Sequence, residues 1–167
     1  KAIRRQRQIC IRDRIYSDIV CELEDGKNVA MLTIGDPSVY STYMYIHKRV
    51  MQVGFTAVMI SGVPSFCAAA ARLGISLGEM MDEIHIIPAS YDVGDTVGYG
   101  GTCVYMKSGK KLAELIEVLR TGDAIRKKKM TVYGVTNCGM ESERVYRGLD
   151  ELTEAKGYLT IVIVKYS

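Results

Sequence analysis

Two consecutive strand–loop–helix units constrain this chain of 167 residues more than any other feature. In the first unit, an apolar run at 28–34 is followed by a Gly-Asp-Pro-Ser break and then by apolar residues at helical spacing up to Gly54. In the second, an apolar run at 55–60 leads through a loop at 61–64 into an alanine-rich helix at 65–73. Such units predict an α/β fold with parallel strands and right-handed crossovers.

The rest of the chain continues with short strands and helices. A short amphipathic helix ending near Gly26 precedes the first unit, and Ser108 would cap a helix that runs to Arg120. Residues 143–149 fit either a helix or a strand. Apolar runs predict further strands at 84–87, 103–107, 130–135 and 159–164.

The glycine-rich and proline-containing stretch at 88–101 indicates a boundary between domains. We therefore expect one α/β domain over residues 1–88 and a second over residues 89–167.

Composition excludes several classes of protein. With 48% hydrophobic and 25% charged residues the chain has the balance of a globular protein, and no apolar run approaches the ~20 residues of a membrane helix. The five cysteines are scattered and odd in number, which predicts neither a disulfide framework nor a zinc site. We expect a soluble cytoplasmic protein without a membrane partner, in which Cys67 and Cys103 are small buried side chains.

Positive charge is concentrated at the start of the chain. Residues 1–14 carry six basic side chains against one acidic one, a net charge of +5, whereas the whole chain has +3. A nucleic-acid interface would have to rest on this terminus alone, so we expect no nucleic-acid partner. The string Cys10–Arg14 resembles translated adapter sequence and the chain begins with Lys, so we assign no function to residues 1–14 and expect an N-terminally truncated protein.

The two loops that follow the first predicted strands are the candidate ligand-binding segments. In open α/β sheets, ligands bind beyond the carboxyl ends of the strands, where residues 35–41 and 61–66 would lie. Asp36 has two interpretations: it accepts from an amine or hydroxyl of a ligand, or it is the N-cap of a helix with Pro37 at the first position. On residue types alone the helix cap is the more frequent role.

Other ligand-binding signatures are missing from the sequence. There is no dinucleotide fingerprint at the start of a helix and no phosphate-binding Gly-Lys-Ser/Thr loop. Neither histidine has a cysteine or carboxylate at metal-ligand spacing, so we expect no metal site.

The string Gly35-Asp36-Pro37-Ser38-Val39-Tyr40-Ser41-Thr42 resembles the second conserved motif of the tetrapyrrole (corrin/porphyrin) methylase family. Further stretches resemble, in order, the branch that methylates precorrin-2 or its cobalt form, cobalt-factor II, at C20. They are residues 41–45, 62–66, 87–89, 106–110, 137–141 and 158–165. The resemblance extends over roughly residues 22–165, and several motifs in order are far more specific than any one alone.

The resemblance implies a fold and a cofactor. The fold would have an N-terminal domain with a parallel sheet, incomplete here, and a C-terminal domain with a mixed sheet. S-adenosylmethionine would bind in the cleft between the domains of a homodimeric enzyme. The family begins with a strand and a Gly-rich, Pro-containing loop for which this chain has no counterpart, so the resemblance again implies that the chain is truncated.

The resemblance also implies site residues. Those that would contact the cofactor are Gly35, Asp36, Val39, Ser65, Phe66, Met106, Cys138, Gly139 and Thr160. Of these, Asp36 and Val39 would line its methionine or ribose part, and Cys138 or Gly139 would lie near the adenine. Because the tetrapyrrole acceptor carries several carboxylates, Lys107 and Arg72 are expected to bind it.

The implied reaction is in-line attack of a ring carbon on the sulfonium methyl group. It depends on positioning, so no catalytic side chain is predicted. The alternatives are a methyltransferase acting on another tetrapyrrole carbon or on a protein side chain, and a non-catalytic α/β ligand-binding module.

Overall fold

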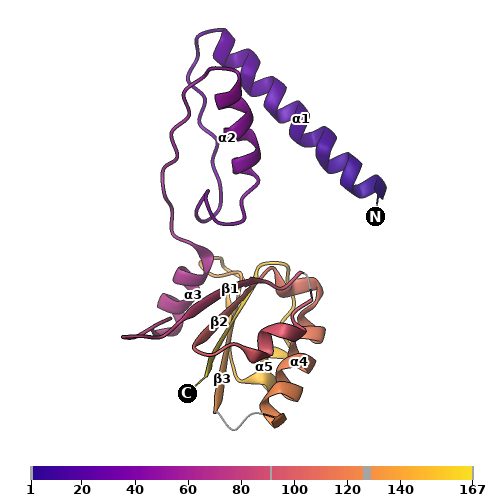
Figure 1. Cartoon of the computed structure of the whole chain (residues 1–167), viewed down its shortest axis with the longest axis vertical. Helices are drawn as coiled ribbons and strands as arrows, with labels where there is room; N and C mark the ends of the chain where they lie inside the picture. Colours follow the sequence, from indigo (N-terminus) through magenta and orange to yellow (C-terminus); the bar gives the residue numbers. More distant parts are fainter. Residues whose placement is uncertain (1, 91, 126–128, 167) are drawn as a thin grey trace. The chain divides into compact units, whose positions relative to one another are not determined.

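The computed structural model describes residues 2–90, 92–125 and 129–166. The chain forms two compact units, Lys1–Pro64 and Ser65–Ser167 (Figure 1). None of the helices in the described residues is long and apolar enough to span a bilayer.

The first unit contains two helices that pack against each other, α1 (Ala2–Glu24) and α2 (Tyr43–Gln52) (Figure 1). Asp13 of α1 accepts hydrogen bonds from the Tyr45 hydroxyl at 2.8 Å and from the Arg49 guanidinium. The predicted end of the first helix near Gly26 and the helix predicted after the first loop are confirmed, but the first helix is not short, since it begins at Ala2 and has 23 residues. The stretch to which we assigned no function therefore contributes a side chain to the packing of this unit.

The two apolar segments of the first unit are not strands. Residues 28–34 and 55–60 run without regular secondary structure, and no backbone ladder forms within the described residues 2–64. Their side chains are largely exposed: 90% for Leu32, 87% for Ile34 and 83% for Ile60. Apolar, branched residues favour a strand, but a strand also needs a neighbour to receive its backbone hydrogen bonds. The prediction of strands here was wrong because the sequence pattern does not supply that neighbour.

The second unit is built on one mixed sheet of five strands in the order β1-β2-β5-β3-β4. Only β1 and β2 are parallel, whereas the other neighbours are antiparallel. The strands are β1 (Ile84–Pro88), β2 (Thr102–Met106), β3 (Met130–Thr136), β4 (Arg144–Arg147) and β5 (Thr160–Tyr166). The expected mixed sheet is confirmed, and the ambiguous segment at 143–149 contains a strand.

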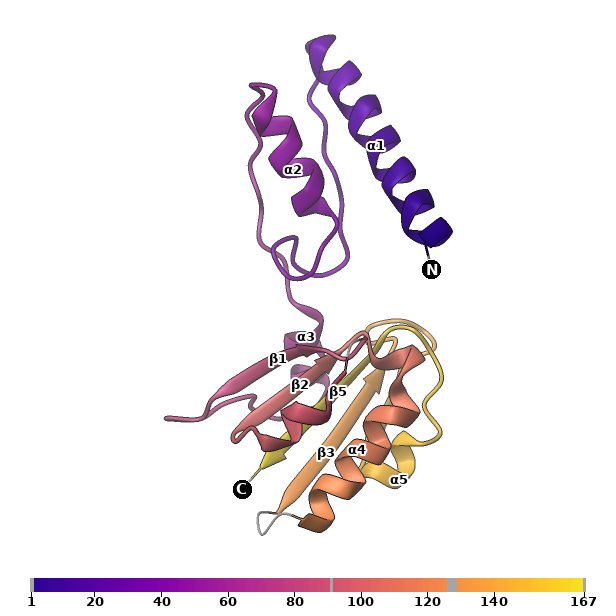
Figure 2. The same cartoon turned by 45° about the vertical axis from the view of Figure 1, so that its right-hand side comes forward.

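Helices cover both faces of this sheet (Figure 2). One face carries α3 (Ser65–Leu73), which contacts β3 and β5. The other carries α4 (Leu112–Ile125) and the short α5 (Leu149–Leu152). Two 3₁₀ turns, η1 (Gly94–Gly98) and η2 (Ser108–Lys110), flank β2.

The core of the second unit follows from strand alternation, which sends every second side chain to the same face. Buried residues of the strands pack with the apolar stripe of α4 and with Leu152 of α5. They are Ile87, Cys103, Tyr105, Val132, Tyr146, Val162 and Val164.

The compact units divide between Pro64 and Ser65, not after Pro88 where the sequence predicted a boundary. The reason is β1: all five of its residues pair with β2, so the sheet includes it. The glycine-rich stretch at 88–101 is therefore the connection between two neighbouring strands of one sheet. Turn-forming residues mark a break in regular structure, and such a break occurs within a domain as readily as between domains.

Candidate functional site

Asp36 connects the two loops that were predicted to bind a ligand, residues 35–41 and 61–66. One carboxylate oxygen accepts from the hydroxyl of Ser38 and, at 2.8 Å, from its backbone N–H; the other accepts from Gly62 N–H at 2.9 Å. These donors, first of all the Ser38 hydroxyl, lower the pKa of the Asp36 carboxyl. Asp36 is thus a carboxylate at neutral pH.

The helix-cap interpretation of Asp36 was wrong. Helix α2 begins at Tyr43, with Thr42 in the capping position and the Ser41 hydroxyl accepting from the Tyr43 N–H at 3.1 Å. Asp36 instead closes a turn with Ser38 and ties that turn to Gly62. Gly35 and Val39 lie in the same loop and are half-buried.

Several predicted residues of the second unit lie together at one end of the three central strands of its sheet, which is called its edge below. The carboxyl ends of β2 and β3 and the amino end of β5 lie there, because Tyr105 pairs with Val162 and Thr136 pairs with Thr160. Met106 ends β2 and Thr160 begins β5, and both are buried.

Buried hydroxyls connect these strands at that edge. The Thr136 and Thr160 hydroxyls are 3.1 Å apart, and the Ser108 hydroxyl donates to the Thr160 carbonyl at 3.1 Å. Ser108 is therefore not the helix cap predicted for it, and α4 begins only at Leu112. Lys107, next to it, has a left-handed backbone with φ 58°, a conformation that costs free energy for a residue with a Cβ.

The turn that follows β3 holds Cys138 and Gly139. Asn137 and Gly139 both have positive φ, 52° and 79°. The Gly139 N–H donates to the Glu143 carboxylate at 2.7 Å, and the Asn137 side chain donates to the Ser142 hydroxyl at 2.9 Å. Hydrogen bonds to Ser142 and Glu143, which follow the turn in the sequence, thus hold its conformation.

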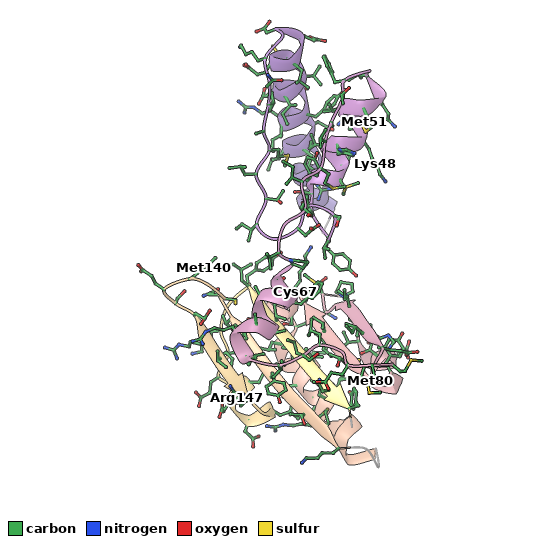
Figure 3. The ribbon with its side chains drawn as sticks, turned by 90° about the vertical axis from the view of Figure 1, so that its left-hand side faces the viewer. Lys48, Met51, Cys67, Met80, Met140 and Arg147 are labelled. Atoms are coloured by element: carbon green, nitrogen blue, oxygen red, sulfur yellow. The ribbon has the colours of Figure 1, made fainter. Side chains whose placement is uncertain are left out.

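Helix α3 contributes Ser65, Phe66 and Arg72. Phe66 is buried on the apolar face of the helix and Ser65 is half-buried. The Arg72 guanidinium, expected to bind substrate, forms a salt bridge with Glu143. Cys67 is exposed on this helix (Figure 3), so the prediction that it is buried was wrong, whereas Cys103 is buried as expected.

The predicted residues thus fall into two groups. Those of the second unit lie at the edge formed by β2, β3 and β5 or on α3: Ser65, Phe66, Arg72, Met106, Lys107, Cys138, Gly139 and Thr160. Gly35, Asp36 and Val39 lie in the first unit.

Sequence analysis missed Glu143 and the role of Gly62. Both act through partners distant in sequence, 71 residues for Arg72–Glu143 and 26 for Asp36–Gly62, and no local pattern marks such pairs.

The donor and acceptor groups fit parts of S-adenosylmethionine. Asp36 is ionised, and a carboxylate oxygen can accept more than the single N–H that Gly62 donates, so it suits the amine or ribose hydroxyls. At Gly139 no atom lies within 4 Å of the place that a Cβ would occupy, which leaves room for a flat group against the backbone. The described residues hold no cluster of three metal-ligating side chains.

The family model for Tetrapyrrole (Corrin/Porphyrin) Methylases matches residues 4–153. The chain belongs to the tetrapyrrole methylase family. The match includes most of residues 1–14, the Asp36 loop and strands β1 to β4, and it ends before β5.

Two relatives are named for methylation at different positions. The chain is 34% identical over 145 residues to a probable cobalt-precorrin-2 C(20)-methyltransferase of Methanocaldococcus jannaschii, covering 85% of this chain and 60% of that protein. It is 42% identical over 52 residues to a precorrin-4 C(11)-methyltransferase of Rhodococcus erythropolis, covering 31% of this chain and 21% of that protein. The chain thus covers less than two thirds of the length of the Methanocaldococcus jannaschii relative.

Two solved structures share the fold. The cobalt precorrin-4 methyltransferase CbiF superposes with a TM-score of 0.77 at 16% identity, covering 92% of this chain and 70% of that one. A uroporphyrin-III C-methyltransferase from Thermus thermophilus, complexed with S-adenosyl homocysteine, gives 0.72 at 16% identity, covering 92% and 72%. The α/β fold expected from the sequence is therefore confirmed.

Proposed function

We propose that the protein containing this chain transfers a methyl group from S-adenosylmethionine to C20 of precorrin-2 or cobalt-factor II in corrin biosynthesis. The observation that carries this proposal is the 34% identity over 85% of the chain with a relative named for that reaction. We further propose, from the family resemblance, that the complete protein is a cytoplasmic homodimer.

In the proposed mechanism, the chain binds the cofactor and the tetrapyrrole acceptor and orients them for the reaction. Bound S-adenosylmethionine supplies an electrophilic methyl group that needs no further activation. Asp36 would accept from the amine or ribose hydroxyls of the cofactor, and the Cys138–Gly139 turn would hold its adenine. Lys107 attracts the carboxylates of the acceptor. Holding donor and acceptor in line contributes several kcal/mol, as in other reactions catalysed by proximity.

A second candidate is methylation at C11. The Rhodococcus erythropolis relative favours it, although the match covers only 31% of the chain. A third, a ligand-binding module without catalysis, would bind cofactor and yield no product.

The cofactor assignment is tested by calorimetric titration of the full-length protein with S-adenosylmethionine and S-adenosylhomocysteine. We expect Asp36→Ala to weaken binding about ten-fold or more, because it removes a charged acceptor. The matched control is Asp92→Ala, since Asp92 closes the same kind of turn by accepting from Gly94 N–H at 3.0 Å. The cofactor assignment would be refuted if Asp36→Ala bound as tightly as the unmodified protein, or if the unmodified protein did not bind.

The position of methylation needs a separate experiment. The full-length protein is incubated with precorrin-2 or cobalt-factor II, and the product is analysed by mass spectrometry and NMR. One added methyl at C20 is the expected result. A methyl at C11 would favour the second candidate, and a methyl at any other carbon would refute the C20 proposal. Cofactor binding without product from either tetrapyrrole would favour the third.

A further inference from the structure

Glu143 joins the turn after β3 to helix α3. One carboxylate oxygen accepts the Gly139 N–H at 2.7 Å, and the other is paired with the Nε of Arg72, in the last turn of the helix. The Glu143 side chain is 16% exposed, whereas that of Arg72 is 58% exposed. The acid is therefore enclosed between the turn and the helix, and the arginine covers it from outside.

The electrostatics are consistent with a permanent negative charge at this position. Arg72, and after it the Gly139 N–H, lower the pKa of the Glu143 carboxyl. The pKa of the neighbouring Cys138 thiol is raised, mainly by burial and further by the charge of Glu143. Cys138 thus remains a neutral thiol beside an ionised carboxylate.

We propose that Glu143 is a positioning residue for the cofactor, an inference that rests on the proposed function. In the turn it holds, Asn137 has a positive φ, which costs free energy for a residue with a Cβ and persists where the surroundings hold it, whereas Gly139 adopts its positive φ without that cost. Glu143 fixes the turn by accepting the Gly139 N–H, and no atom lies within 4 Å of the place that a Gly139 Cβ would occupy. A turn fixed in advance spares the cofactor the cost of ordering it.

The salt bridge extends this role to a second segment. Arg72 belongs to the helix that starts with Ser65 and Phe66, which are expected to contact the cofactor. One carboxylate therefore restrains two of the segments of the second unit that carry expected contacts, although it is itself not expected to touch the ligand.

The same unit offers a matched control. Glu151 accepts the Arg147 N–H at 2.7 Å, with the same separation of four residues along the chain as in Glu143 and Gly139. Arg147 is the last residue of β4 and pairs with Tyr133, whereas Arg144 at the start of that strand pairs with Thr136. Figure 3 shows Arg147 on β4, away from Met140 in the turn after β3.

The test uses Glu143→Ala, Glu143→Gln and Glu151→Ala in the full-length protein. Dissociation constants for S-adenosylhomocysteine, Tm, and kcat and KM for the methyl donor are measured for each. We expect Glu143→Ala to raise the dissociation constant and the KM about ten-fold, with kcat within about two-fold. Glu143→Gln should give values between those of the unmodified protein and Glu143→Ala, because its amide oxygen can accept the Gly139 N–H but the side chain no longer forms the salt bridge with Arg72.

Hydrogen exchange in the ligand-free protein gives a second measurement. The Gly139 N–H should exchange faster in Glu143→Ala and at the original rate in Glu143→Gln and Glu151→Ala. If Glu143→Ala does not fold, Glu143→Asp takes its place, since its shorter side chain cannot keep both partners.

Three results would overturn the inference. The first is unchanged binding in Glu143→Ala while the unmodified protein binds. The second is equal weakening by Glu151→Ala, which would indicate a general loss of stability. The third is a failure of the unmodified protein to bind S-adenosylhomocysteine, which refutes the proposed function and the positioning role together.

Discussion

Gly109→Ala should force apart two segments of the second unit, the turn at Gly109 and the segment at Gly157 and Tyr158. A Cβ at Gly109 would lie 2.2 Å from the Gly157 carbonyl oxygen and 2.9 Å from the Tyr158 Cα, both backbone atoms that cannot rotate away. Relieving the contact requires a backbone displacement of about 1 Å, since ordinary Cβ contacts begin near 3.4 Å. Overpacking of this kind costs about 1–3 kcal/mol.

The displacement also endangers the adjoining hydrogen bond from Ser108 to the Thr160 carbonyl, which adds about 1 kcal/mol. A total near 2–4 kcal/mol corresponds to a fall in Tm of at least about 8 °C for a unit of this size. The assay is thermal unfolding followed by circular dichroism, with Gly100→Ala as control because nothing lies within 4 Å of its Cβ position. A Tm for Gly109→Ala within about 2 °C of that control would refute the reasoning.

Two further predictions concern single groups of the second unit. Tyr105→Phe should lower the free energy of unfolding by about 1 kcal/mol, because it removes the 3.0 Å bond between the Tyr105 and Thr96 hydroxyls while Thr96 keeps its bond to Val93. Denaturant unfolding measures this, and a loss above about 3 kcal/mol would contradict it. The folded state lowers the pKa of Glu143 below its ordinary value of 4.5, so its stabilisation is complete above that pH and is lost as the pH falls through the folded pKa. The Tm difference between the unmodified protein and Glu143→Gln should therefore be largest near neutrality and shrink below about pH 4.5, and a constant difference would argue against it.

The sequence predicted the second unit better than the first. Helix α3 begins and ends at the predicted residues, and the strands at 84–87, 103–107, 130–135 and 159–164 agree with the structure within about two residues. Each of these strands has a neighbour in the same sheet. The equally apolar runs at 28–34 and 55–60 have none in the described residues 2–64, so local composition alone could not decide their structure.

The candidate site divides in the same way. The Gly35–Val39 motif and the Cys138–Gly139 turn are each one continuous stretch of sequence. Both lie in loops of the structure. Glu143 is different: its role depends on Arg72, 71 residues away, and on a turn whose conformation the fold determines. A glutamate in a polar stretch has no periodicity or motif that would distinguish it from a solvated charge.

The position of β5 in the sheet has a consequence for synthesis on the ribosome. This strand comes last among the described strands, yet it lies between β2 and β3 and pairs with both. Before Thr160–Tyr166 has emerged, the nascent chain can form only two separate pairs, β1–β2 and β3–β4, whose inner edges are unpaired. The sheet therefore closes late during translation, and a chain released before that point would expose two edges open to aggregation.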